Sequence, residues 1–159
     1  MATMSACLPP LNGPPPMLDS SSRRVNLRRL RRICLKLPET RETVKWRHPT
    51  FEAGKKIFAV LDHYQGSFCI AFRVPPDQAA GLLQDDRFFE APYGAGRGWL
   101  CLRTDGKLNW QNIAGLLKES YRQVALKRML TALDEVEPPD ARQGRPRKRG
   151  RGRRPLSGQ

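Results

Sequence analysis

The chain has 159 residues, with 29 Lys and Arg against 15 Asp and Glu, a formal net charge of +14. A positive excess of this size points to a polyanionic partner, most often nucleic acid, although a tail that only aids solubility would give the same count. No apolar run approaches the ~18 residues of a membrane span, and the N-terminal residues lack the basic start and apolar run of a signal peptide. We expect a cytoplasmic protein, compatible with association with the nucleoid, and no membrane partner.

Composition divides the chain into three segments. Residues 1–24 contain five prolines and a serine run, and residues 138–159 contain no aromatic residue and a single leucine. Neither segment can bury enough apolar surface to offset the entropy of ordering, so we expect both to be disordered. Residues 25–137 carry the apolar periodicity of one folded domain. The C-terminal segment holds eight basic side chains and one Asp, so it is far more basic than the domain.

The first predicted element is a helix over residues 25–37, VNLRRLRRICLKL. Leu30 and Cys34 recur at helical spacing, Pro38 ends the run, and Asn26 or a preceding serine could cap it. The opposite face is strongly basic. It is either a solvated face or a surface that meets phosphates, and its candidate contacts are Arg28, Arg29 and Arg32.

Three β segments follow. Residues 43–62 predict short strands around a turn at Gly54, with Lys55 and Lys56 at or beside its tip. Residues 68–74 predict a central strand, and residues 88–104 a pair of strands closed by a glycine-rich loop. Between these last two lies a short helix that begins near Pro75 and Pro76.

The domain closes with helical periodicity from residue 109 onward. Asn109 is a credible N-cap, and Gly115 or Ser120 could mark a kink between two helices. The order of elements predicts an α+β fold in which a single antiparallel sheet packs against helices. The large aromatic side chains expected in its core are Trp46, Phe51, Phe58, Trp99 and Trp110.

The loop PYGAGRG, residues 92–98, could in principle cradle a phosphate. Such a cradle needs converging backbone N–H groups at the start of a helix, whereas the residues that follow this loop have β character. The glycines fit a tight hairpin tip better, because glycine accepts positive φ. Arg97 would then project from the tip as a charge-bearing side chain.

Several short motifs, in this order and spacing, resemble the MmcQ/YjbR family of small bacterial proteins from about Leu27 to Leu130. They are Leu35-Lys36-Leu37-Pro38, Lys45-Trp46, His48-Pro49-Thr50-Phe51, Lys56-Ile57-Phe58-Ala59, Pro92-Tyr93, Arg97-Gly98-Trp99 and Ser120-Tyr121. The resemblance implies a CyaY-like fold and a DNA-binding role through a double wing of β-hairpins. By position, the wings would be the Gly54–Lys56 turn and the Gly94–Gly98 loop.

Related frataxin/CyaY proteins bind iron through acidic side chains near their first helix, since hard cations prefer carboxylate oxygens. Residues 25–38 of this chain contain no Asp or Glu. An iron-binding role is therefore disfavoured.

The C-terminal segment resembles an AT-hook, whose Arg-Gly-Arg-Pro core lies in a narrow A·T-rich minor groove. Gly144-Arg145-Pro146 supplies most of that core, but Gln143 stands where the motif has arginine. Generic polyanion binding and RNA binding of the Arg-Gly-Gly type remain open. The candidate tail contacts are Arg145, Arg147, Lys148, Arg149, Arg151, Arg153 and Arg154.

Catalytic and metal-binding patterns are weak. The two histidines, His48 and His63, have no supporting acid or nucleophile motif, and the four cysteines, at positions 7, 34, 69 and 101, form no Cys-x-x-Cys pair. We expect reduced, mostly buried thiols, no metal, no cofactor and no enzymatic activity. The sequence thus predicts a nucleic-acid-binding protein, with DNA favoured and RNA left open. The alternative is a protein-interaction or small-ligand module whose tail binds polyanions without specificity.

Overall fold

The structure, a computed structural model, describes residues 20–94 and 96–136. The tail contacts expected at residues 145–154 lie outside this range, as does Cys7. The elements are α1 (Ser20–Cys34), β1 (Thr40–Lys45), β2 (His48–Ala53), β3 (Lys56–Tyr64), β4 (Ser67–Arg73), α2 (Pro76–Leu82), β5 (Phe88–Glu90), β6 (Trp99–Arg103), α3 (Trp110–Val124) and α4 (Lys127–Val136).

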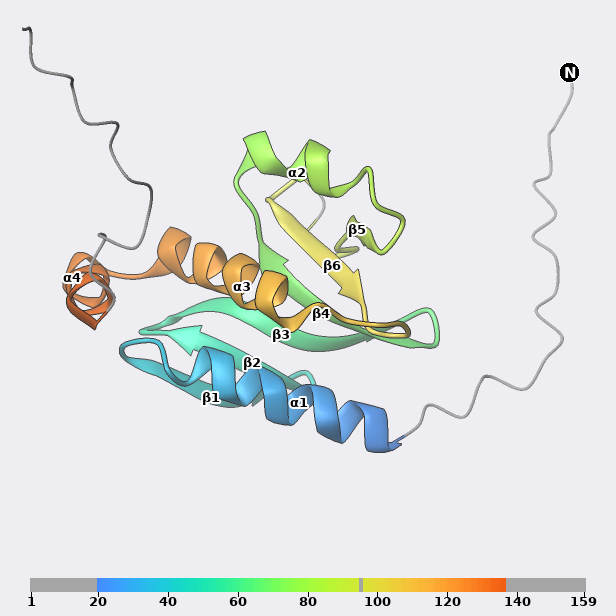
Figure 1. Cartoon of the computed structure of the whole chain (residues 1–159), viewed down its shortest axis with the longest axis horizontal. Helices are drawn as coiled ribbons and strands as arrows, with labels where there is room; N and C mark the ends of the chain where they lie inside the picture. Colours follow the sequence, from blue (N-terminus) through green and yellow to red (C-terminus); the bar gives the residue numbers. More distant parts are fainter. Residues whose placement is uncertain (1–19, 95, 137–159) are drawn as a thin grey trace, which may run out of the picture.

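The strands form one antiparallel sheet in the order β1-β2-β3-β4-β6-β5 (Figure 1). Every neighbouring pair except β4 and β6 is consecutive in the chain, because α2 and β5 are inserted between those two strands. The α+β class and the single antiparallel sheet predicted from the sequence are confirmed.

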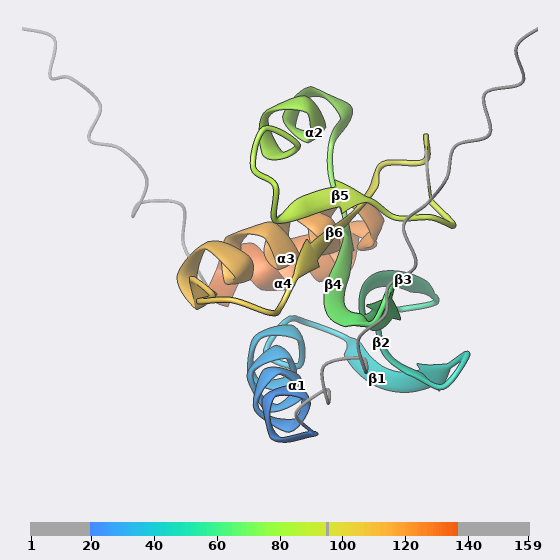
Figure 2. The ribbon, with the colours of Figure 1, turned by 90° about the vertical axis from the view of Figure 1, so that its right-hand side faces the viewer.

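The helices gather on one side of the sheet, and the strands and loops form the other side (Figure 2). Strand alternation sends Phe58, Ile70 and Phe72 toward the helices, where they join the main core with Leu30 and Tyr121. A smaller cluster on the other side contains short side chains from β4 and β6. The fold therefore has one covered face and one face without helices, which we call the open face.

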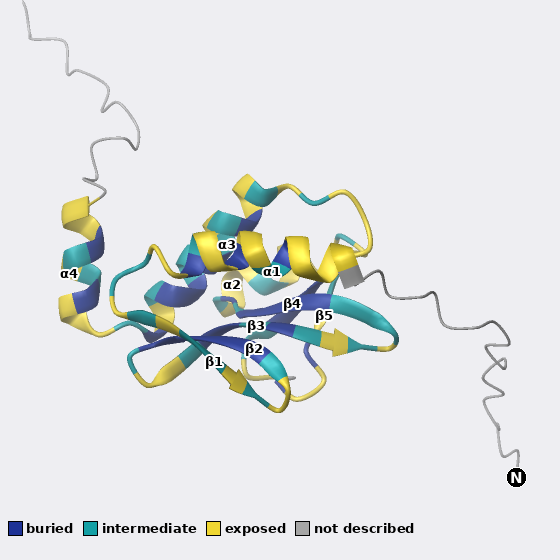
Figure 3. Ribbon diagram, turned by 90° about the horizontal axis from the view of Figure 1, so that it is seen from below, coloured by how far each residue is buried: buried dark blue, intermediate teal, exposed yellow. Residues whose placement is uncertain are grey.

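Helix α1 turns its apolar stripe to the sheet and its arginines outward (Figure 3). It begins at Ser20, so it includes the last residues of the segment expected to be disordered, and Asn26 is buried inside it instead of capping it. The Arg23 guanidinium lies 5.3 Å from the ring centre of Phe68, which helps to hold this first turn against the sheet.

Strands β1 and β2 form a tight hairpin that the sequence did not predict as a separate unit. Lys45 pairs with His48, so Trp46 and Arg47 alone make the turn, with φ of 51° and 68°. Two positive φ values are typical of a type I′ turn, which usually carries Asn and Gly. Trp46 is 77% exposed at this tip, so its expected place in the core is wrong.

Helix α3 begins as predicted, with the Asn109 side chain accepting hydrogen bonds from the backbone N–H groups of Gln111 and Asn112. The expected kink at Gly115 or Ser120 is wrong, because the helix runs unbroken to Val124 and ends at the extended residue Ala125. The buried Ser120 hydroxyl instead donates to the Phe58 carbonyl and accepts from the Arg73 N–H. It thus ties α3 to two strands of the sheet.

No helix among the described residues is long and apolar enough to cross a membrane.

Candidate functional site

The Gly54–Lys56 turn lies at one end of the sheet, between β2 and β3. Gly54 has a φ of 60°, and its Cα faces Leu126 and Met129, which a Cβ would approach to 4.0 Å. Lys55 and Lys56 are exposed. The predicted turn is therefore present, but it is short and sits beside the start of α4.

The loop between β5 and β6 is a folded hairpin end that leads into a strand, as the glycine pattern predicted. Its turns are closed by hydrogen bonds from the Gly94 N–H to the Ala91 carbonyl and from the Arg97 N–H to the Gly94 carbonyl. A Cβ on Gly94 would lie 2.4 Å from the Cβ of Trp99, so only glycine allows the loop to fold back here. Arg97 is exposed at its tip.

The two predicted wings lie at the same end of the sheet. The Gly54 turn joins β2 to β3, and the Gly94–Gly98 loop joins β5 to β6, which are the outer pair on the other side of β4. Three strand spacings separate the two connections along the sheet, and the twist between strands widens that separation. The structure therefore brings Lys55, Lys56 and Arg97 to one end of the molecule.

The α1 arginines form a second surface. Arg28, Arg29 and Arg32 are exposed on the outer face of the helix layer, and the Arg29 guanidinium lies 5.3 Å from the ring centre of Trp110. Helix α1, which carries them, lies in the helix layer and not on the open face of the sheet (Figure 3). The predicted core contacts thus divide between the helix layer and the end of the sheet.

Ion pairs set these candidates apart from several, but not all, of the other basic residues of the domain. Among the described residues, the basic side chains that pair with carboxylates include Arg31, Arg41, Lys45, Arg87, Arg122 and Arg128. Within residues 20–94 and 96–136, no carboxylate lies within ion-pair distance of the six predicted core contacts. Their positive charge is therefore not neutralised within this part of the chain.

The open face holds a cavity of about 650 Å³ that the sequence did not predict. The residues that define it come from four strands and two connections, and they include Trp46, Val60, Ala71, Ala91, Tyr93 and Trp99. Tyr93 is 89% exposed. Aromatic residues beside hairpin turns were the sequence signal that could have indicated this cavity. The apolar character of Trp46 led instead to its prediction as a core residue.

Two polar residues of the open-face cavity form a weak pair. His48 Nε2 lies 3.5 Å from an oxygen of Asp62, across the neighbouring strands β2 and β3. His63 also lines the cavity, and its ring packs edge-on against Phe68.

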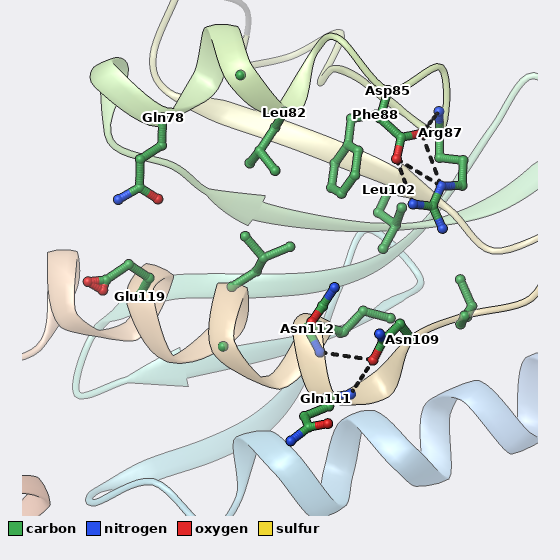
Figure 4. Close-up of a pocket in the computed structure, with 15 residues that line it drawn as sticks. Gln78, Leu82, Asp85, Arg87, Phe88, Leu102, Asn109, Gln111, Asn112 and Glu119 are labelled. Carbon is green, nitrogen blue, oxygen red and sulfur yellow. Dashed lines mark hydrogen bonds and ion pairs between the residues drawn. The ribbon is translucent and has the colours of Figure 1, made fainter. Parts of the chain in front are cut away.

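A second cavity, of about 590 Å³, lies between α2 and α3 on the helix side (Figure 4). Its floor is apolar, with Leu82, Phe88 and Leu102, while part of its polar rim is already bonded within the protein. Asp85 and Arg87 form a bidentate ion pair, and the Asn109 side chain caps α3. The rim therefore offers few uncommitted charged groups to a ligand.

The thiols are poorly suited to catalysis. Cys34, Cys69 and Cys101 are free and buried, which confirms the expectation for these three. Burial raises the pKa of the Cys34 thiol, and the hydrogen bond with Cys101, followed by burial, raises the pKa of the Cys69 thiol. Among the described residues, no three His, Cys, Asp or Glu side chains group as a metal site.

Comparison with protein-family models matches residues 35–123 to the YjbR family. A solved structure of a Deinococcus radiodurans protein with the family domain DUF419 is 23% identical, with a TM-score of 0.55 over 67% of this chain and 83% of that one. A Pseudomonas syringae protein is 14% identical, with a TM-score of 0.51 over 64% and 97% of the two chains. At these identities the likeness shows the fold alone. Curated proteins give no match.

Proposed function

The chain belongs to the YjbR family, and on this premise we propose that it binds nucleic acid without catalysis, with duplex DNA favoured. The core contributes Lys55, Lys56 and Arg97, helped by the α1 arginines. The basic C-terminal tail adds a second set of phosphate contacts, with an AT-hook-like preference for the minor groove.

The observation that carries the proposal is the unneutralised charge at these six core positions. An arginine that already binds a carboxylate must lose that partner before it binds a phosphate, whereas Arg97 and the two lysines need only shed water and counterions. The release of counterions from DNA then favours binding at low salt.

The absence of catalysis belongs to the same proposal. Its support is that the hydrogen bond with Cys101, followed by burial, raises the pKa of the Cys69 thiol, and that a carboxylate, Asp62, lies beside His48. A protein of this type would act by occupying or shaping nucleic acid.

The relative weight of the two binding regions follows from their contact numbers. If four of the core candidates contact phosphates, the slope of log K against log salt on duplex DNA would be ~−3.6, and contacts from all eight basic side chains of residues 138–159 would add ~−7. The tail should therefore supply most of the affinity, and the core should set the orientation of the protein on DNA.

The test measures this salt slope with the full chain and a variant that carries Lys55→Gln, Lys56→Gln and Arg97→Gln. Each lost phosphate contact should reduce the slope by about 1 unit, giving about 3 in total. A control variant with Gln78→Glu, Gln84→Glu and Gln123→Glu changes the net charge equally at exposed helix-side positions and should keep its slope. Equal slopes in both variants would contradict a binding role for the core.

The runner-up function is a small-ligand module, for which the cavity between α2 and α3 is the specific observation. In that case the triple glutamine variant and its control should bind DNA alike, through the tail alone. A Leu82→Trp substitution that fills the cavity would then abolish ligand binding and leave DNA binding intact.

A further inference from the structure

We propose that the open face of the sheet binds unpaired nucleobases of a single-stranded nucleic acid, with Trp46 and Tyr93 as the stacking groups. This inference rests on the proposed function, because it adds recognition of single strands to the proposed binding of duplex DNA. It adds base contacts on the open face to the phosphate contacts proposed above and shares Arg97 with them.

The first support is the exposure of two aromatic rings on one cavity. Trp46 is 77% exposed and Tyr93 is 89% exposed, and both line the open-face cavity from separate hairpins. When a flat partner covers a large ring that was exposed to water, the free energy falls because apolar surface is buried. Every nucleobase has such a flat face, but in a duplex that face is already stacked on its neighbours.

The second support is the backbone that presents Trp46. Trp46 and Arg47 have φ of 51° and 68°, a left-handed conformation that bulky residues rarely adopt. Asn and Gly would form the same turn at lower cost. Strain of this kind concentrates at binding and catalytic sites, because the side chain itself is needed there.

The third support is the way the other ring is held. The Gly94 Cα lies so close to Trp99 that any side chain would clash, and the Ala91 N–H and the Trp99 carbonyl are hydrogen-bonded at 3.1 Å. The backbone on both sides of Tyr93 is thereby fixed against β6. The exposed ring is presented by backbone that is anchored on both sides of Tyr93, which lowers the entropy lost on binding.

The floor between the rings is made of short side chains. Ala71 and Ala91 line the cavity, with Val60 beside them, and the buried Cys69 and Cys101 belong to the same cluster. Short residues on the central strands and large rings at the rim leave a cavity of about 650 Å³, large enough for a nucleoside. A flat base can therefore lie on this floor beside either ring.

Charge selects a nucleic acid over an apolar peptide. Arg47 and Arg97 are exposed at the two hairpin tips next to Trp46 and Tyr93, and neither has a carboxylate partner within residues 20–94 and 96–136. The Arg73 guanidinium lies 5.8 Å from the ring centre of Trp99. Each aromatic group thus has a cation nearby that can meet the phosphate of a stacked nucleotide.

The experiment compares the full chain with Trp46→Ala, Tyr93→Ala and Trp46→Phe variants. Fluorescence anisotropy measures binding to a short oligo(dT), an oligo(rU) and a duplex, at a salt concentration high enough to weaken phosphate contacts. Val44→Ala is the matched control, since Val44 is an exposed apolar residue on β1 that does not line the cavity. All variants keep the net charge.

We expect each alanine variant to bind the single strands about 5- to 100-fold more weakly, the cost of one lost base stack, while duplex affinity changes less than about 2-fold. The phenylalanine variant should recover most of the loss, and the two oligonucleotides show whether the sugar matters. Unchanged single-strand affinity in both alanine variants, with intact duplex binding, overturns this inference and leaves the proposed function standing. Failure of the wild-type chain to bind any of the three overturns both.

Discussion

The two faces of the sheet differ in which side chains they bury. On the covered face Phe58, Leu61 and Ile70 are almost fully buried under helices, and they belong to the main core of the domain. On the open face the strands carry short residues such as Ala71, while the rings of Trp46 and Tyr93 stay in water. One face of the sheet can therefore supply the buried core that stabilises the fold, while the other face stays available for binding.

Truncation of the covered face should have the largest effect on stability. Phe58 is fully buried and meets Tyr121 edge-on, with ring centres 5.7 Å apart. Phe58→Ala should lower the free energy of unfolding by about 3–5 kcal/mol in urea titrations. Trp46→Ala should lower it by less than about 0.5 kcal/mol, because the exposed Trp46 ring buries little surface in the folded protein. Comparable losses in the two variants would break the comparison.

The polar link between helix and sheet should have the next largest effect. Ser120→Ala removes the hydroxyl that bridges the Phe58 carbonyl and the Arg73 N–H in a buried setting. We expect a loss of about 2 kcal/mol in the free energy of unfolding, because buried polar groups are left without a partner. A loss below half of this, by thermal or urea unfolding, would mean that water replaces the hydroxyl.

A substitution at Glu52 tests whether ion pairs stabilise the pairing of β1 with β2. Glu52 is buried and binds both Lys45 and Arg41, and the hydrogen bond from Lys45, then that from Arg41, lowers the pKa of its carboxyl. Its contribution is therefore complete above the unfolded pKa, near 4.3, and is lost as pH falls through the lower folded value.

Glu52→Gln should cost about 1 kcal/mol at neutral pH and flatten the acid limb of the stability profile. Urea unfolding of both proteins between neutral and acidic pH measures the difference. If stability fell equally with pH in both proteins, the loss of stability in acid would come from other carboxylates.

The smallest expected change is an increase in the free energy of unfolding. Trp46→Asn with Arg47→Gly supplies the residues that a type I′ turn prefers, and it should raise the free energy of unfolding by about 0.5–1 kcal/mol. The same variant should lose affinity for single-stranded oligonucleotides. A variant that gained stability and kept this affinity would remove the link between turn strain and recognition.

The sequence predicted the fold class, the turn at Gly54 and the Asn109 cap because each rests on local periodicity or on a residue with a specific backbone preference. It missed the hairpin tip at Trp46 because the turn there breaks the usual residue preference. The predicted kink at Ser120 failed for a related reason, since that residue serves a tertiary contact with β3 and β4. Local rules identify elements, whereas long-range contacts decide which face each side chain occupies.

An open sheet has two edges at which another chain could add a strand. Among the described residues neither edge strand has a further partner, yet each is a poor template. Strand β1 carries Arg41, Glu42 and Lys45 along its short length, and β5 spans only Phe88–Glu90. Charged and very short edges resist edge-to-edge aggregation. Within residues 20–94 and 96–136, one face of the sheet can thus stay free of helices while its edge strands discourage polymerisation.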